Sequence, residues 1–490
     1  MVRMTMPIPP EKFELPHLDV ADAAERLYAA MAGEVWAKAT FEQKQQVIMQ
    51  GLRGVGAVIE ERALQESATT VERIEVEGVA YRRLEQPSSI CCFGMWGAYR
   101  IAEPLYREVG VHNGRTIKPL EKAAGLVTKT MTPMLARTLG EMQADMTSRE
   151  AVKRLRRLGL GSGERAYAAD HVHTLEVEIA DRIVELERAA RAGEKLPEGA
   201  ASISLGMDRR TVPMEEVRPV DQPPKTERRP RRKPYVRKQP APIDVNYRMA
   251  YVGTVSLVDE HGEAIRTTRH TMEADGDPRS LAERLRAEVE DILVKQPGLP
   301  ISIVQDGAKE LDVLPATLRR GAASHTRMYE CTDFHHLTDY LDKVVATCEP
   351  AGDPDNMRTW YRDKLLHDER GIDHIFAGLR RRAHALPKTA ANADARRAVA
   401  RALSYIRHRR HKMRYATMRR ANLVIGSGTT ESTCKLIGHR TNRSGIRWGV
   451  PGVRGTMAIR ALVLSDRWDL AWEHYARSKI AIVKPLQAAA

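Results

Sequence analysis

Cysteine is scarce in this sequence, and its scarcity excludes two classes of protein. Five cysteines occur in 490 residues, and only Cys91 and Cys92 are neighbours. An odd number at these spacings builds no disulfide framework, and no CxxC pair supplies the ligands of a structural zinc site. We therefore expect a reducing, cytoplasmic compartment, with Cys91 and Cys92 packed in a core.

Long apolar runs are also lacking, and acidic residues are outnumbered by basic ones. No stretch reaches the roughly 18 apolar residues of a membrane span, and residues 1–16 lack the apolar centre of a secretory signal. Lys and Arg number 78 against 64 Asp and Glu, so the formal charge is +14 and the pI about 9.5. This balance favours a polyanionic partner, most simply nucleic acid, and we expect no membrane partner.

The first 195 residues divide into three predicted regions. Apolar residues recur at helical spacing near the N-terminus, so 1–69 is predicted as a helical region. Short alternating runs predict a small antiparallel β-sheet region over 70–132. Residues 133–195 contain a short helix capped by Ser148, a glycine-containing turn and a long helix. That outline is typical of a helix-turn-helix that binds DNA, and plain packing of two helices gives the same outline.

The order of elements after residue 200 carries the fold prediction. A strand ending at Asp208, a hairpin and an amphipathic helix precede a strand ending at Asp306 and another ending at Asp333. Further helices then lead to Glu431 on a helix of its own. A strand with an acid, a hairpin, a crossover helix and a parallel strand with a second acid make up the ribonuclease H-like arrangement. Carboxyl ends of parallel strands meet at one edge of such a sheet.

The predicted fold is therefore α+β and multidomain. A ribonuclease H-like core, a mixed sheet flanked by helices, is built from 200–352 and 421–490, and 353–420 is a helical insertion. This core is preceded by a mainly helical N-terminal region with a small β-sheet. Within the core, 221–242 is a basic Pro-rich loop whose composition builds no core. It is either a solubilising insert or a strap that contacts phosphates.

Asp208, Asp306 and Glu431 are the candidate catalytic and metal-binding residues. Three carboxylates supply the hard oxygen ligands with which two Mg²⁺ (or Mn²⁺) ions promote phosphodiester hydrolysis or transfer. Glu431 follows a glycine-rich turn at a helix start, a position that also suits any Glu because of the helix dipole. Asp259 and Asp312 are weaker alternatives, since Asp259 lies in a hairpin turn and Asp312 well past a strand end.

Asp333 and His336 form an Asp-x-x-His pair directly after a strand. Two interpretations stay open for this pair. One is a helix N-cap with a packed histidine, and the other is a supporting role beside the three acids.

Long and unusual motifs recur along the chain. They include VEGVAYRR at 76–83, LGMDRRTVPMEE at 205–216, QDGAKE at 305–310 and DFHHLTDYL at 333–341. The most specific block, 413–465, contains IGSG, an ES pair and R-x-x-x-SG-x-RW. Together these motifs resemble the DDE transposases of bacterial insertion sequences, in the ISKra-like group related to Mutator-type transposases.

The resemblance implies that Asp208, Asp306 and Glu431 are the catalytic acids and that Asp333 and His336 match the family's Asp-x-x-His. It implies Mg²⁺ or Mn²⁺ at two positions, no organic cofactor, and double-stranded DNA (terminal inverted repeats and target) as substrate in the bacterial cytoplasm. It also implies a homodimer or a larger homo-oligomer. The chain departs from related groups at Arg209, where they commonly have glycine.

Basic residues around Glu431 and in the Pro-rich loop are the predicted DNA contacts, because phosphate contacts would position DNA over the acids. A solvated helix face explains part of this set equally well. The predicted set is Lys435, Arg440, Arg443, Arg447, Trp448, Arg410, Lys412, Arg414, Arg231, Arg232 and Lys233. Two other functions stay open: a transposase-derived DNA-binding protein without catalysis, and a ribonuclease H-like nuclease that cuts without strand transfer.

Overall fold

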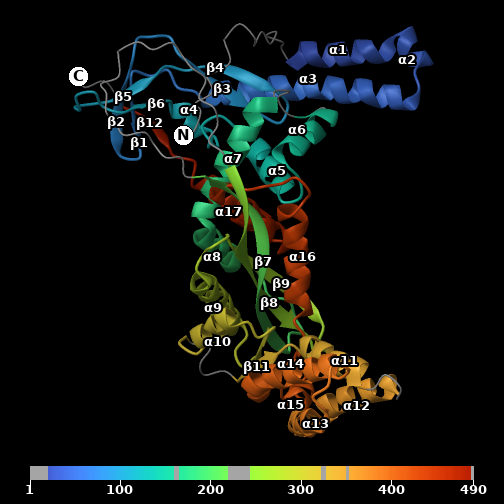
Figure 1. Cartoon of the computed structure of the whole chain (residues 1–490). Helices are drawn as coiled ribbons and strands as arrows, with labels where there is room; N and C mark the ends of the chain where they lie inside the picture. The colour runs from blue at the N-terminus through green and yellow to red at the C-terminus, as the bar shows by residue number, and fades with distance from the viewer. Residues whose placement is uncertain are drawn as a thin grey trace, which may run out of the picture. The chain divides into compact units, whose positions relative to one another are not determined.

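The computed structural model describes residues 20–158, 160, 165–218, 243–321, 327–348 and 353–486. The chain divides into two compact units, Met1–Ala190 with Arg467–Ala490, and Arg191–Asp466 (Figure 1). The predicted Pro-rich loop, with Arg231, Arg232 and Lys233, lies outside the described residues, as does most of the predicted glycine turn before residue 165. In the part of the chain that is described, every helix is too short or too polar to cross a membrane.

The first unit begins with an antiparallel helical hairpin, as the apolar spacing predicts. Its helices are α1 Val20–Ala32, α2 Glu34–Lys38 and α3 Phe41–Ser67. Thr40 starts α3 with a capping box, in which its hydroxyl accepts from Gln43 N (3.3 Å) and its own N–H donates to the Gln43 side chain (2.8 Å).

The same unit contains a small antiparallel sheet and a separate two-stranded hairpin. The sheet has the order β12-β1-β2-β5-β6, and the hairpin pairs β3 with β4. The strands are β1 Arg73–Val76, β2 Val79–Arg83, β3 Ser89–Phe93, β4 Ala98–Ala102, β5 Tyr106–Glu108, β6 Thr116–Ile117 and β12 Val483–Pro485. Glu77 and Gly78 join β1 to β2 with φ of 53° and 80°, the backbone of a tight hairpin turn. Cys92 is buried with Ile90 and Tyr99, so its predicted packing role is confirmed.

The predicted helix-turn-helix region consists of helices whose details differ from the prediction. They are α5 Pro133–Gln143, α6 Ser148–Arg157, α7 Arg165–Asp181 and α8 Ile183–Gly193, and α4 Pro119–Ala123 and α18 Trp468–Arg477 complete the helices of this part. Thr147, not Ser148, caps α6, because Thr147 and Glu150 form a capping box. The expected long helix is interrupted at Arg182, whose N–H bonds to Ile179 O instead of continuing the regular ladder.

The second unit is built on a mixed five-stranded sheet of order β11-β10-β7-β8-β9. Strands β7, β8 and β9 are antiparallel neighbours, while β10 runs parallel to both β7 and β11. The strands are β7 Ser202–Val217, β8 Ile243–Val258, β9 Ala264–Met272, β10 Ile301–Gln305 and β11 Met328–Thr332. The helix α9 Pro278–Lys295 connects β9 to β10, and Asp277 caps it through Arg279 N (2.9 Å). The predicted hairpin, crossover helix and two later strands are therefore confirmed.

Helices cover both faces of this sheet. Leu281, Leu285 and Val289 of α9 pack on Leu205 of β7 and Ile303 of β10, together with the 3-10 turn Lys309–Asp312 and α10 Val313–Leu318. On the opposite face lie α16 Gly428–Thr441 and α17 Val450–Leu464 (Figure 1). Because side chains alternate along a strand, odd-numbered residues of β7 near Leu205 face α9, and Gly206 and Asp208 face α16.

The helix α11 Phe334–Cys348 precedes the predicted insertion at 353–420, and the helices over that range pack on it in one core. They are α12 Pro354–His367, α13 Gly371–Ala385, α14 Ala393–Arg409, the 3-10 turn Arg410–Lys412 and α15 Tyr415–Arg420. Leu337 and Leu341 of α11 lie in this core with Leu379 of α13 and Ile406 of α14. The apolar spacing of each helix supplies the buried face.

One strand differs from the prediction in a way that concerns the site. Strand β7 does not end at Asp208 but continues to Val217, paired with β8 over its whole length. The residues after Asp208 still alternate, with Val212 and Met214 buried against Trp448 and Val453. A partner strand distant in the sequence therefore extends β7 beyond the point where the local pattern indicates an end.

Candidate active site

Two of the three predicted acids lie side by side because of the parallel register of β7 and β10. Leu205 pairs with Ile303, and Asp208 and Asp306 each lie three residues further along their strands. Asp306 follows the last residue of β10, where Gly307 turns the chain away with φ of 89°. Asp306 Oδ1 accepts a hydrogen bond from Ala308 N (2.8 Å), which closes this turn. Asp208 is thus inside a strand, yet it lies at the edge where the parallel pairing stops.

The third acid arrives on α16, which packs closely on the sheet. Thr430 Oγ1 lies 2.7 Å from Thr254 Oγ1 of β8. A Cβ on Gly206 of β7 would stand 2.2 Å from Thr430 Oγ1, so only glycine allows this approach. Glu431, the next residue, lies in the first turn of α16 and is half-buried.

The three carboxylates influence one another. The pKa of Asp208 is raised, mainly by burial, with further increases from the charges of Asp306 and Glu431. The Cys434 thiol, one turn along α16 from Glu431, hydrogen-bonds to Asp208 and opposes this increase. Accumulated negative charge at one sheet edge is the environment in which a cation is stabilised.

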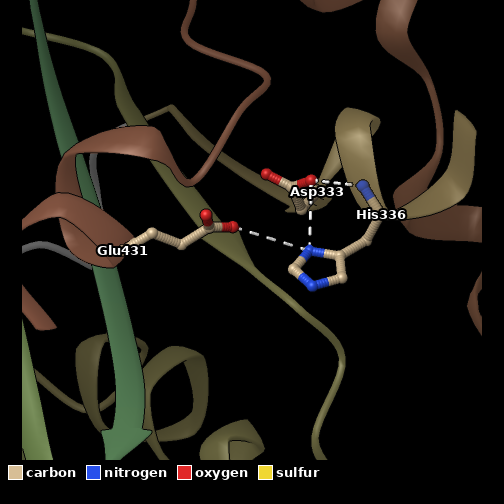
Figure 2. Close-up of side chains that lie close together, drawn as sticks. All are labelled: Asp333, His336 and Glu431. Carbon is tan, nitrogen blue, oxygen red and sulfur yellow. Dashed lines mark hydrogen bonds and ion pairs between the residues drawn. The ribbon is translucent and has the colours of Figure 1, made fainter. Parts of the chain in front are cut away.

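Asp333 connects α11, α16 and Glu431 in a single polar cluster (Figure 2). Its Oδ1 accepts from His336 N (2.6 Å), and its Oδ2 accepts from Ser427 N, the residue that precedes α16. His336 Nδ1 forms ion-pair contacts with Asp333 Oδ1 (3.3 Å) and Glu431 Oε1 (3.8 Å). Ser427 Oγ donates to Glu431 Oε1 (3.0 Å). The predicted Asp-x-x-His pair therefore combines both interpretations, since Asp333 caps the start of α11 and His336 contacts an acid of the site.

The charges in this cluster are well defined. Hydrogen bonding to Asp333 raises the pKa of His336 to about 9, with contributions from Glu431 and Asp306, so the imidazole is a cation at neutral pH. Burial alone would raise the pKa of Asp333, but hydrogen bonds from His336 and Ser427 outweigh it. The pKa of Asp333 consequently lies well below its usual value.

The cluster also contains side-chain atoms that lie close enough together to bind one metal ion. Among the described residues, Asp333, His336 and Glu431 each offer a ligand atom, and these atoms lie within 4.8 Å of one another. Asp208 and Asp306 do not join this group at that distance. However, both Asp333 oxygens already accept hydrogen bonds, and a protonated His336 has no free lone pair. The oxygen donors that remain as candidates for a hard cation are those of the half-buried Asp208, Asp306 and Glu431.

Comparison with models of known protein families and with curated protein sequences gave no match. The arrangement of the chain's own residues therefore carries the functional argument.

The alternative acids have contacts of their own within the protein. Asp259 accepts from the backbone N–H groups of His261 and Glu263 (2.9 Å each) and closes the β8–β9 turn. Asp312 pairs with Lys412 (2.9 Å). Their contacts account for both residues without a catalytic role.

Two predicted DNA contacts are buried. Arg440 is 3% exposed, and its guanidinium stacks 4.8 Å from the centre of the Trp448 ring. Trp448 bonds to Thr441 O through its indole N–H (2.8 Å), and its backbone pairs with Pro213 of β7. The prediction that Arg440 and Trp448 contact DNA is therefore wrong. Their side chains fill the space between α16 and β7 and present no surface to DNA.

Other predicted contacts are accessible but already paired with acids. Arg410 and Arg414 both contact Asp373 (3.3 and 3.6 Å). Lys412 lies 2.9 Å from both Asp312 and Glu330. Two further predictions, Lys435 and Arg443, are exposed on the surface, and Arg447 pairs with Glu215 (2.7 Å).

Sequence reasoning missed the residues that fix Asp306. Tyr405 of α14 donates to Asp306 O (2.9 Å), and Arg409, one turn later, donates to Gly307 O (3.1 Å from Nε). Tyr405 stacks on Tyr340 of α11, with ring centres 4.5 Å apart. The signal in the sequence was the i, i+4 spacing of Tyr405 and Arg409, which places both on one helix face.

Proposed function

We propose that this chain is a metal-dependent DNA transposase that cuts and joins strands by two-metal chemistry on three carboxylates. The observation that carries the proposal is the meeting of Asp208, Asp306 and Glu431 at one edge of a mixed sheet. They come from a strand, a strand end and a helix far apart in the sequence. A half-buried acid whose pKa is raised by burial and by neighbouring acids is typical of a functional site.

The fold is compatible with this activity. A ribonuclease H-like core needs an antiparallel three-stranded meander, a crossover helix and two strands parallel to the first. The order β11-β10-β7-β8-β9 with α9 between β9 and β10 supports that assignment. Helices after β11 that return a third acid to the same edge support it further.

The donor set fits divalent ions such as Mg²⁺ or Mn²⁺. Asp208, Asp306 and Glu431 would hold them, because carboxylate oxygens are the ligands these ions prefer, and neutralising the mutual repulsion of the acids favours their binding. When bound, two such ions activate the attacking oxygen and stabilise the leaving oxygen of a phosphodiester.

The chain's other residues position these acids. Ser427 and His336 hold one oxygen of Glu431, Tyr405 and Arg409 hold the backbone at Asp306 and Gly307, and the Cys434 thiol bonds to Asp208. Water attacks the phosphodiester first, and the released 3′-hydroxyl then attacks target DNA. In this proposal the DNA is the double-stranded end of a mobile element, and a homodimer or larger assembly brings two ends together.

The test is strand cleavage and joining on DNA that carries the element's ends, with Mg²⁺ present, for the wild type beside Glu431→Gln. The substitution keeps the shape of the side chain and removes its charge, so we expect a loss of about 10³-fold or more in rate, with unchanged DNA binding. Glu260→Gln in the exposed β8–β9 turn is the matched control and should retain full activity.

The outcomes separate the three functions. DNA binding without cutting by the wild type would overturn the catalytic proposal and favour a transposase-derived binder. Cutting without joining, with no complex containing two DNA ends on sizing, would favour a ribonuclease H-like nuclease. Equal activity of wild type and Glu431→Gln would remove Glu431 from the site.

A further inference from the structure

A cavity opens beside Asp306 between α11 and α14. It has a volume of about 1020 Å³, and its lining includes Asp306 itself and His336. Volumes of roughly 300–1,000 Å³ are usual for ligand sites, so this space is large enough for a ligand to reach Asp306. The cavity therefore begins at the proposed active site and extends away from it.

Two helical stripes form its walls. His336, Tyr340 and Lys343 of α11 follow one another at spacings of four and three residues, which places them on one face. Arg401 and Tyr405 of α14 do the same. The stacked rings of Tyr340 and Tyr405 join the two stripes, so the walls have a fixed relation to the Asp306 turn.

The cations on these walls differ in what they contact. Three are engaged within the protein: Arg397 pairs with Asp394, Arg209 pairs with Glu310, and Arg409 bonds to Gly307 O. Lys343 and Arg401 are exposed, and among the residues that the structure describes neither forms an ion pair. Lys343 Nζ lies over the ring of Tyr340, 5.7 Å from its centre, so its charge stays at the cavity wall beside that ring.

We propose that Lys343 and Arg401 bind backbone phosphates of the DNA strand that flanks the reacting phosphodiester. Lys343 lies seven residues along α11 from His336, or about 10 Å at 1.5 Å per residue, and Arg401 lies about 6 Å along α14 from Tyr405. Both cations therefore lie along the cavity from Asp306, where phosphates next to the reacting one would lie. The acids would hold the reacting group while the two cations hold its neighbours. This inference rests on the proposed function, because it describes where the DNA strand would lie beside the three acids.

The experiment measures binding of a fluorescein-labelled oligothymidine by anisotropy over a range of NaCl concentrations, in EDTA. Each phosphate contact on single-stranded DNA contributes about 0.7 to the slope of log K against log salt. The double variant Lys343→Ala with Arg401→Ala should therefore reduce the slope by about 1.4 and weaken binding by about tenfold at moderate salt. Lys343→Arg with Arg401→Lys should restore both.

Arg410→Ala with Arg414→Ala is the matched control. It removes the same two charges from the same unit, but both arginines are paired with Asp373, so the slope should not change. Equal decreases in both double variants would show a net-charge effect and overturn the proposal, as would an unchanged slope in the first variant. Urea unfolding of each variant confirms that the fold is intact.

The absence of metal separates this test from the test of catalysis. Loss of slope together with inactive wild-type protein would support the phosphate site and reject the transposase. Active wild-type protein with an unchanged slope would reject only the phosphate site.

Discussion

A deeply buried carboxylate lies in each of the two units, and the two are held in opposite ways. Glu103 in the first unit is 1% exposed, and Asp333 in the second is 0% exposed. Burial raises the pKa of Glu103 to about 7, against a smaller opposing effect of hydrogen bonds from Leu120 N and Thr69. The pKa of Asp333 lies well below its usual value, since His336 and Ser427 donate to it.

The difference shows that burial alone does not decide the charge of a carboxylate. Backbone N–H groups offset part of the desolvation at Glu103, whereas a nearby cation together with two N–H donors outweighs it at Asp333. At Asp333 the ionised form is stabilised, and its donors come from the elements that carry the rest of the candidate site. Glu103 is held by a helix start, Leu120 of α4, with no other function indicated.

The substitution expected to have the largest effect is Asp333→Asn, which removes the carboxylate charge. The amide group of Asn meets an N–H donor where the carboxylate accepts, so we expect a loss of about 3 kcal/mol in the free energy of unfolding at neutral pH. Urea unfolding of the second unit, followed by hydrogen exchange of α11 and α16, provides the measurement. Asp339→Asn, on the exposed side of α11, should cost less than about 0.5 kcal/mol. Equal costs at both positions would contradict the role assigned to Asp333.

The role of burial at Glu103 is tested by measuring stability against pH for the wild type and for Glu103→Gln. With a folded pKa of about 7 and an unfolded value near 4.5, the folded state binds the proton more tightly, so stability falls as pH rises from 4.5 to 7. Wild type should therefore be about 2.5 kcal/mol less stable at pH 8 than at pH 5 from this group. The Gln variant should lack this difference when hydrogen exchange of α4 reports unfolding. A Gln variant with the wild-type pH dependence would place the titration elsewhere.

A smaller loss of stability is expected at Tyr405, whose hydroxyl donates to a backbone carbonyl oxygen instead of a carboxylate. Tyr405→Phe keeps the ring stacked on Tyr340 and removes the hydrogen bond to Asp306 O. We expect a loss of about 1 kcal/mol in unfolding free energy and about a fivefold lower cleavage rate, with unchanged DNA affinity. Single-turnover kinetics beside DNA titration separates rate from affinity. A decrease in affinity alone would assign Tyr405 to DNA contact.

Much of the second unit could be predicted from local pattern. The hairpin, the crossover helix, the strands ending before Asp306 and Asp333, and the helix start at Glu431 all follow from apolar periodicity and turn residues. The continuation of β7 past Asp208 could not be predicted, because it depends on pairing with β8, whose residues come more than 25 positions later in the sequence.

The site was predictable in its residue types and less so in its contacts. The order of elements indicates that Asp208, Asp306 and Glu431 share an edge. The hydrogen bond from Ser427 to Asp333 and the contacts of Arg410 and Arg414 with Asp373 depend on how the helices pack, which no spacing in the sequence encodes. A high density of basic residues in the sequence therefore did not identify which cations are unpaired on the surface.

The position of Glu431 in the chain has a consequence for biosynthesis. All five strands of the second unit's sheet, and the helices of the insertion, are translated before α16 emerges from the ribosome. Domains fold as units during synthesis, so the sheet and the insertion can assemble while the third acid is still missing. A chain truncated between Arg409 and Glu431 would contain α11 and α14, which form the walls of the cavity, but not the third acid.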